Sequence, residues 1–259
     1  MHCHVLAGID DGPETIEGSL ALARVAEQRG IDTIIATPHV SWRYGNDAAT
    51  IAGLVEQTND ALTAAGVAVR VLTGAEIAMS RAPDVPREEL SALTLGGGPW
   101  LLLECPFTSS AAGMSTLIGE LEEAGHGVML AHPERSPAFQ RDPQMLESLV
   151  RGGVLTSITA GSLVGRFGAP VKRFALSLME AELVHNVASD AHDPEQRRPG
   201  IADELREAGL EAMTEWLTEG VPRALIDGED SLPPRPHMDY SRIAARESWW
   251  RRGPLRRAW

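Results

Sequence analysis

Short apolar runs alternate with longer amphipathic stretches throughout residues 1 to 228. The apolar runs are continuous rather than alternating, which favours β-strands that are covered on both faces of a parallel sheet. The stretches between them have helical composition, and the first opens on Pro13 and ends before Gly30, as helices commonly do. The predicted strands are 2–6, 32–37, 68–75, 99–104, 127–131, 154–159 and 184–189, and the predicted helices are 13–29, 47–65, 113–125, 143–152, 169–182 and 199–219.

This repeated β/α order indicates an α/β fold with a parallel sheet. Seven predicted strands favour a distorted (β/α)7 TIM-like barrel, which has one strand fewer than the common eight. An open, doubly wound sheet shares the same alternation and stays open as the alternative. At 259 residues the chain has the length of one such barrel domain, to which we assign residues 1–229.

Residues 230–259 differ in composition from the rest of the chain. Proline-rich residues 232–236 interrupt regular structure, and Trp249, Trp250 and Trp259 are then interleaved with arginines. We interpret this segment as a tail that packs over the protein's own body or is disordered. Docking to a partner or to anionic lipid is the alternative, because Trp and Arg are favoured in both settings.

Charge and hydropathy narrow the function. The net charge is −13, and from Leu232 onward seven arginines against two acidic residues give +5, so the remaining body carries −18. A body this acidic repels phosphates and argues against broad nucleic-acid binding. No apolar run approaches the roughly 18 residues of a transmembrane segment, and the N-terminus lacks a signal-peptide pattern. We therefore expect a cytoplasmic protein in which Cys3 and Cys105 are buried, reduced thiols.

Metal-binding side chains stand at the ends of nearly all the apolar runs. In a parallel barrel the carboxyl ends of all strands meet at one mouth, so these side chains would converge. His2 and His4, two residues apart on a strand, would leave the same face. A structural role could explain each histidine separately, but it does not explain why all of these side chains lie at the same end of the predicted strands. The candidate ligands are His2, His4, Asp11, His39, Glu76, Glu104, His132, Asp190 and His192.

Mixed imidazole and carboxylate ligands suit Mn, Zn or Fe better than Mg or Ca. Nine candidates exceed the coordination of one ion, so a carboxylate such as Glu76 could bridge two. Clustered divalent ions serve phosphoryl or acyl hydrolysis, because they acidify a shared water and neutralise charge on the leaving oxygen. Neither cysteine has an arginine six residues later to hold phosphate, which disfavours a thiol phosphatase. No P-loop motif occurs, which disfavours a nucleotide hydrolase of that type.

Several sequence blocks together resemble a known family. The opening residues 2–13 (HCHVLAGIDDGP) resemble the start of the polymerase-and-histidinol-phosphatase (PHP) superfamily. They are similar in particular to the manganese-dependent protein-tyrosine phosphatases that accompany bacterial capsule and exopolysaccharide kinases. The likeness covers about residues 1–225 and continues at ATPH (36–39), GAEI (74–77), LECP (103–106), AHPER (131–135), AGSL (160–163), ASDAH (188–192) and RP (198–199).

This resemblance implies a PHP-type barrel with three divalent ions, manganese first and iron or zinc as alternatives. The first ion would be held by His2, His4, Glu76 and Asp190, the second by Glu76, Glu104 and His132, and the third by Asp11, His39 and His192. Arg135 and Arg198 would bind the phosphate, since a guanidinium can bind two oxygens. A metal-bridging hydroxide would attack phosphorus in line, and Asp11 or His192 would shuttle the proton.

The implied substrate is a phosphotyrosine-bearing protein, and we expect it to be the tail of a bacterial tyrosine kinase. A small-molecule phosphatase of the histidinol-phosphatase type is the alternative enzyme, and a catalytically weak metal-binding regulatory module is an alternative outside enzymes. Family members carry a few residues, including an Asp, before the first two histidines. We therefore expect either a looser first metal site or a true start upstream of Met1. The oligomeric state stays open.

Overall fold

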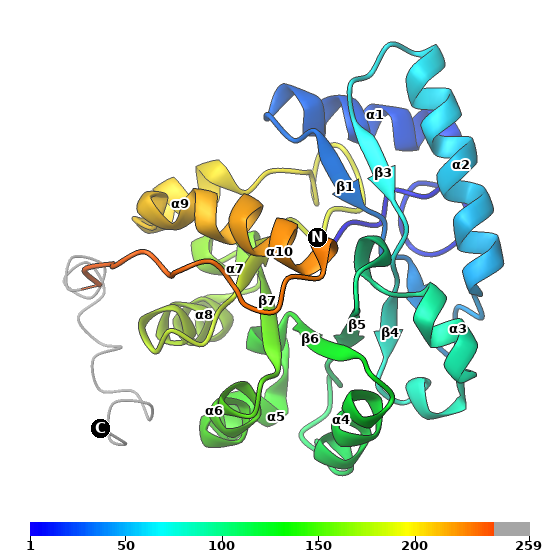
Figure 1. The fold of residues 1–259 in the computed structure, drawn as a ribbon. Coiled ribbons are helices and arrows are strands. Elements are labelled where there is room, and N and C mark those ends of the chain that lie inside the picture. Colours follow the sequence, from blue (N-terminus) through cyan, green and yellow to red (C-terminus); the bar gives the residue numbers. More distant parts are fainter. Residues whose placement is uncertain (241–259) are drawn as a thin grey trace.

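The computed structural model describes residues 1–240, in which helices lie around a set of parallel strands (Figure 1). The strands are β1 (Thr33–Ile35), β2 (His39–Val40), β3 (Arg70–Leu72), β4 (Glu76–Ala78), β5 (Trp100–Glu104), β6 (Gly127–Ala131), β7 (Leu155–Thr159) and β8 (Asn186–Ala188). The α-helices are α1 (Ile16–Gln28), α2 (Ala48–Ala64), α3 (Arg87–Ala92), α4 (Met114–Glu123), α5 (Pro137–Arg141), α6 (Pro143–Arg151), α7 (Ala160–Val164), α8 (Ala169–Glu180), α9 (Ala202–Ala208) and α10 (Val221–Asp227). Short 3-10 helices occur at Ala82–Asp84, Leu95–Gly97, Pro133–Arg135 and Glu211–Met213, and a π-helix at Trp216–Gly220.

All pairs between these strands are parallel, and the strands follow one another in chain order. One sheet has the order β2-β4-β5-β6-β7-β8, and β1 pairs with β3 separately. A doubly wound sheet reverses its strand order at a switch point, so this order speaks against that alternative. Cys3 forms parallel bridges to Ala36, after β1, and to Ala191, after β8. The N-terminal segment therefore connects the first and last parts of the sheet.

The predicted strands at the start of the chain differ from the observed ones. Residues 2–6 do not form a strand, because only Cys3 has bridge partners and the chain then turns through Gly8, which has a φ of 69°. Predicted strand 32–37 ends at Ile35, and the chain pairs again from His39 after Pro38, which has no N–H to donate. Predicted strand 68–75 is likewise interrupted, and β4 begins only at Glu76.

Five of the six predicted helices are found, at α1, α2, α4, α6 and α8, within a few residues of the predicted bounds. The first two begin where a side chain caps the free backbone N–H groups, as Thr15 does for Gly18 and Asp47 does for Thr50. The predicted single helix at 199–219 is wrong. The structure has α9 there, which ends at Gly209 in a left-handed conformation (φ 77°), followed by shorter turns. Helices α3, α5, α7 and α10 were not predicted.

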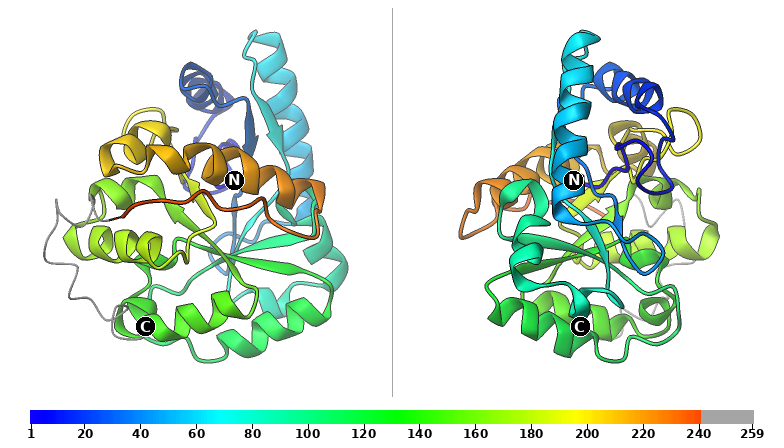
Figure 2. Two further views of the ribbon diagram at one scale, coloured as in Figure 1. Left: turned by 60° about the vertical axis from the view of Figure 1, so that its left-hand side comes forward. Right: turned by 90° about the vertical axis from the view of Figure 1, so that its right-hand side faces the viewer.

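The described part of the predicted tail, residues 230–240, packs on the body beside α10 and α8 (Figure 2). The indole N–H of Trp216 donates to the carbonyl of Pro233 at 2.9 Å, and the Arg235 guanidinium donates to the carbonyl of Val184 at 2.7 Å. Arg235 also lies over the Trp216 ring. Trp249, Trp250 and Trp259 lie outside the described residues, so the alternatives for that segment stay predictions.

The two cysteines agree with a further expectation. Cys3 and Cys105 are both free and buried, as predicted. Within residues 1–240, no helix combines the length and the apolar character needed to cross a membrane.

Candidate metal centre

Five of the nine candidate ligands lie at or close to the ends or beginnings of strands, and the other four, His2, His4, Asp11 and His192, lie in the N-terminal segment and in loops. Glu104 is the last residue of β5, His132 follows β6, and Asp190 lies two residues after β8. His39 and Glu76 begin β2 and β4 and face each other in the parallel register. Both sit just after the breaks that interrupt the predicted strands, so the bends in the chain bring their side chains inward.

Glu76 lies at the centre of the cluster. Its Oε2 atom is 3.0 Å from His39 Nδ1, 3.3 Å from His2 Nε2 and 3.4 Å from His4 Nε2. Its Oε1 atom is 2.8 Å from Nε2 of His132. The side chain is 1% exposed, yet Oε2 has no hydrogen-bond partner. A buried carboxylate oxygen surrounded by imidazole nitrogens without a hydrogen bond is the arrangement that a shared cation satisfies.

The first predicted ligand group is assembled around this carboxylate. The Nε2 atoms of His2 and His4 are 3.2 Å apart, and they lie 3.5 and 3.6 Å from Oδ1 of Asp190. Ligand atoms of His2, His4 and Glu76 all lie within 4.8 Å of one another, which fits one ion. From the sequence we expect either a looser first metal site or a true start upstream of Met1. In the structure, the side chains of this first group are buried and lie close together.

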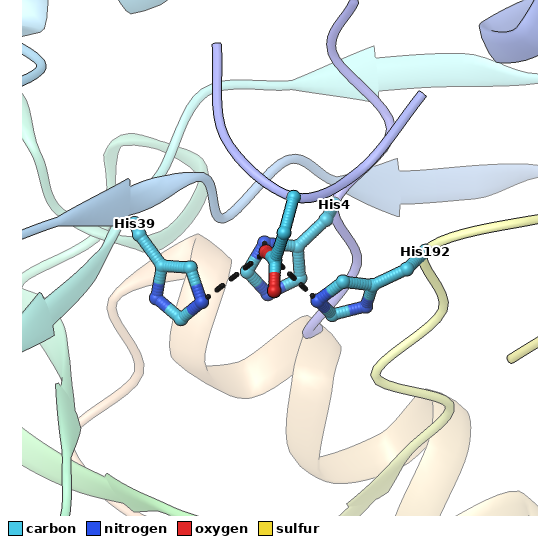
Figure 3. A group of neighbouring side chains, drawn as sticks. His4, His39 and His192 are labelled. Atoms are coloured by element: carbon cyan, nitrogen blue, oxygen red, sulfur yellow. Dashed lines mark ion pairs between the residues drawn. The ribbon is translucent and has the colours of Figure 1, made fainter. Parts of the chain in front are cut away.

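A second group of ligand atoms lies at the outer side of the first. Figure 3 shows the side chains of His4, His39 and His192 pointing toward one another. Asp11 Oδ1 is 3.2 Å from Nε2 of His192 and 3.5 Å from Nε2 of His39. These three residues are the predicted third group, and His4 joins them in the structure.

Glu104, His39 and Glu76 form a further group, and their ligand atoms again lie within 4.8 Å of one another. Burial and the neighbouring charge of Glu76 raise the pKa of Glu104. Two carboxylates this close repel each other unless a cation lies between them. The sequence grouped Glu104 with His132 rather than with His39. In the structure His132 reaches the opposite oxygen of Glu76, so both histidines border this carboxylate pair.

Backbone strain is concentrated at two of these ligands. Within residues 1–240, three residues other than glycine have a positive φ, and two of them are His132 (36°) and Asp190 (50°). The left-handed region is unfavourable for residues with a side chain and persists where the surroundings impose it. At both positions the chain leaves a strand and turns at once, which aims the side chain into the cluster.

Charges within the cluster shift the pKa values of its members strongly. Burial opposes protonation of His4, but its hydrogen bond to Asp10 and the neighbouring carboxylate of Glu76 raise its pKa to about 10. Burial and the neighbouring His4 lower the pKa of His192 to about 4. Burial would raise the pKa of Asp190, but His2, His132 and Arg197 hold it well below its usual range. Asp190 is thus held in its ionised form in a buried site, where a negative charge requires positive partners.

Arg135 and Arg197 both contact Asp190. The Nη1 atom of Arg135 donates to Oδ2 of Asp190 at 2.8 Å, and Nη2 of Arg197 donates to the same oxygen at 2.7 Å. Arg198, the predicted partner of Arg135, is half-buried and forms no ion pair with any residue from 1 to 240. Arg197 was not singled out, because two adjacent arginines in a loop carry no signal that tells which one turns inward.

Asp10 is a second residue that the sequence did not single out. Its Oδ2 accepts from His4 Nδ1 at 2.7 Å and from the His39 backbone N–H at 3.0 Å, while its Oδ1 accepts from the N–H of Gly12. It thereby fixes which ring nitrogen of His4 faces Glu76. The pair of adjacent aspartates, Asp10 and Asp11, is the feature of the sequence that points to this position, but only Asp11 is predicted to be a ligand. His126 and His185 lie outside the metal-ligand groups found among residues 1–240.

Comparison with known proteins shows which protein family this chain is similar to. A family model described as "Capsular polysaccharide synthesis, CpsB/CapC" matches residues 1–215. The tyrosine-protein phosphatase YwqE of Bacillus subtilis is 37% identical over 198 residues, covering 76% of this chain and 78% of the relative. The tyrosine-protein phosphatase CpsB of Streptococcus pneumoniae is 26% identical over 205 residues, covering 77% of this chain and 84% of the relative.

A solved structure agrees with these relatives. It belongs to the crystal structures of YwqE from Bacillus subtilis and CpsB from Streptococcus pneumoniae, described as unique metal-dependent tyrosine phosphatases. It is 33% identical to this chain, superposes with a TM-score of 0.80, and the match covers 92% of this chain and 98% of the solved one. The two proteins therefore share an α/β fold with a parallel sheet.

Proposed function

The chain belongs to the capsular polysaccharide synthesis CpsB/CapC family, and from this premise we propose that it is a metal-dependent protein-tyrosine phosphatase. The observation that carries the proposal is the arrangement around Glu76, whose buried, unpaired oxygen lies within 3.4 Å of three imidazole nitrogens. This centre offers ligands for several divalent ions and has arginines at its border. Bound ions and arginines of this kind can hydrolyse a phosphate ester.

We propose three bound divalent ions, with manganese favoured because the ligands combine imidazoles and carboxylates. His2, His4, Glu76 and Asp190 would hold the first ion, and Glu76, Glu104 and His132 the second. Asp11, His39 and His192 would hold the third, with His4 nearby. The three groups of close ligand atoms support part of this assignment, but Asp190 and His132 belong to none of them, and His39 takes the place of His132 beside Glu104.

Bound divalent ions would supply an activated water and neutralise charge on the phosphate. Arg135 would bind phosphoryl oxygens, while Asp190 and the faces of neighbouring rings hold its guanidinium in place. Arg198, which has no ion-pair partner within residues 1–240, would be the second phosphate-binding arginine. Arg197 would help to fix Asp190. Asp11 or His192 would pass a proton to the leaving phenolate; the 45% exposure of Asp11 and its contact with His192 support this role.

We further interpret the circuit of strand pairs, closed through Cys3, as a distorted (β/α)7 barrel of PHP type that occupies residues 1–229. The substrate would be a phosphotyrosine-bearing protein, and we propose the tail of a bacterial tyrosine kinase of capsule or exopolysaccharide synthesis. Reduced thiols at Cys3 and Cys105 agree with action in the cytoplasm.

The test is a comparison of substrates on protein that has been stripped of metal and reloaded with Mn²⁺. We expect fast turnover of a phosphotyrosyl peptide, slow turnover of histidinol phosphate, and loss of both reactions after chelation. The variant E76Q should lose activity by at least about a hundredfold, because a carboxamide is a poor metal ligand. Fast hydrolysis of histidinol phosphate beside an untouched peptide would instead establish the small-molecule phosphatase. A loaded protein that cleaves neither ester would support the regulatory module.

A further inference from the structure

Phe107 is a large apolar side chain that stays exposed beside the metal centre. It lies in the segment after β5 and is 51% exposed, and among residues 1–240 only Trp42 shares this combination of size, apolarity and exposure. One face of its ring stacks on the imidazole of His132, with 5.6 Å between the ring centroids and 21° between the planes. Because this ring borders the candidate metal centre, its exposed surface is available to contact a ligand bound there.

Arg135 connects Phe107 to the phosphate side of the site. Its guanidinium carbon lies 5.3 Å from the centre of the Phe107 ring and 4.5 Å from the centre of the Phe167 ring, so the cation is held between two aromatic rings. The same guanidinium donates to Asp190. Phe107 therefore stands at the border of the group that would bind phosphoryl oxygens.

Buried side chains limit the direction in which the ester substituent of a bound phosphate can point. His2, His132 and Asp190 are 2–3% exposed and close the inner side of the cluster. A phosphoryl group bound by Arg135 therefore has its ester substituent directed outward, where Phe107 is exposed. An aromatic substituent can stack on that ring or meet it edge to face, whereas a short aliphatic one makes a much smaller contact.

We propose that Phe107 is a specificity-determining residue whose exposed ring packs against the phenyl ring of phosphotyrosine. This inference rests on the proposed function, since it concerns how the same site selects aryl over alkyl phosphates. The phenolate of tyrosine is also the better leaving group, so aryl selectivity in the reaction rate has two sources. Binding of unreactive analogues isolates the contribution of Phe107.

The test measures binding of phenylphosphonate and methylphosphonate to Mn²⁺-loaded protein by calorimetry, because both analogues carry the same head group and neither is hydrolysed. We expect the wild type to bind phenylphosphonate about three- to tenfold more tightly than methylphosphonate. F107A should lose this preference, because its affinity for phenylphosphonate should fall by more than its affinity for methylphosphonate and for inorganic phosphate. F107W, which keeps an aromatic ring, should retain the preference.

Trp42 offers a matched control, since it is 68% exposed and packs against Arg81 rather than against a candidate metal ligand. W42A should leave the phenyl preference unchanged. F167A should weaken both phosphonates together, because Phe167 would act through the position of Arg135.

Two outcomes would overturn the proposal: F107A keeps the full phenyl preference, or it loses affinity for both phosphonates and for phosphate equally. The second result would assign Phe107 a structural role beside Arg135. Hydrolysis of phosphotyrosine by the wild type is measured in parallel. Failure of that reaction with an intact phenyl preference would contradict the proposed function and leave the assignment of Phe107 standing.

Discussion

Asp10 shows how one residue outside the ligand set can determine the geometry of the whole site. It accepts hydrogen bonds from the ring of His4 and from the backbone of His39 and Gly12, so it connects the N-terminal segment to β2. Both histidines supply ring nitrogens to Glu76 or Asp11. The orientation of two imidazoles therefore depends on one carboxylate.

We predict that D10N lowers the affinity for Mn²⁺ by about ten- to a hundredfold, because a carboxamide is neutral and orients the His4 ring less firmly. Titration of metal-free protein by calorimetry measures the affinity directly. D60N, which changes a carboxylate on the exposed surface of α2, is the control and should bind Mn²⁺ as the wild type does. Equal affinities of D10N and D60N would show that Asp10 has no part in orienting the ligands.

The candidate ligands could be predicted from the sequence because a parallel sheet brings strand ends together, whatever the details of the loops. His39, Glu76, Glu104, His132 and Asp190 all follow or end apolar runs, and the structure brings them into one cluster. The positions of Arg197 and Asp10 depend instead on loop conformation. Nothing in the residue types distinguishes Arg197 from Arg198, so only coordinates reveal which one contacts Asp190.

At the scale of elements, the sequence predicted where regular structure occurs better than where it breaks. Hydrophobic runs reflect burial: Thr37 and Val40 near Pro38, and Val71 and Ala75 near Gly74, are buried although the ladders are interrupted there. A Cβ atom on Gly74 would lie 2.7 Å from the Ile35 side chain, so the bend depends on a close approach between β1 and the chain after β3. Such approaches are properties of the packed fold and leave no periodic signal.

A similar close approach holds α10 against the segment that leads into β5. A Cβ atom on Gly98 would lie 2.2 Å from the carbonyl oxygen of Leu225 and 3.2 Å from that of Ile226. Both contacts are with backbone, so G98A cannot be accommodated by a side-chain rotation. We predict that this variant lowers the free energy of unfolding by about 1–3 kcal/mol, as measured by chemical denaturation.

G53A is the matched control for this substitution. Gly53 lies within α2, and a Cβ atom there has no neighbour within 4 Å. Alanine is the better helix former, so this variant should gain about 0.5–1 kcal/mol. If G98A were as stable as the wild type, the segment before β5 would have to move freely relative to α10, and the packing described for these two elements would be incorrect.

At the scale of the whole molecule, the metal centre joins distant parts of the chain. His2 and His4 lie at the N-terminus, Glu76 and His132 in the middle, and Asp190 beyond β8, yet all contribute to one cluster of buried groups. The N-terminal segment has little regular pairing of its own, since only Cys3 forms bridges to its neighbours. Ions that bind this cluster would therefore cross-link the two ends of the strand circuit and stabilise the fold as a whole.

We predict that Mn²⁺ raises the melting temperature of metal-free protein by about 5–10 °C at a free concentration a hundredfold above its dissociation constant. Binding to the folded state alone contributes about 2.7 kcal/mol at that concentration, and in a protein of this size each kcal/mol shifts the melting temperature by about 2–4 °C. Ca²⁺, which prefers oxygen ligands, should give a smaller shift at equal concentration. Calorimetric melting after chelation and after reloading measures the effect. E76Q should show little of it, because Glu76 borders each of the inner ligands, so a full shift in E76Q would place the stabilising ions somewhere other than this centre.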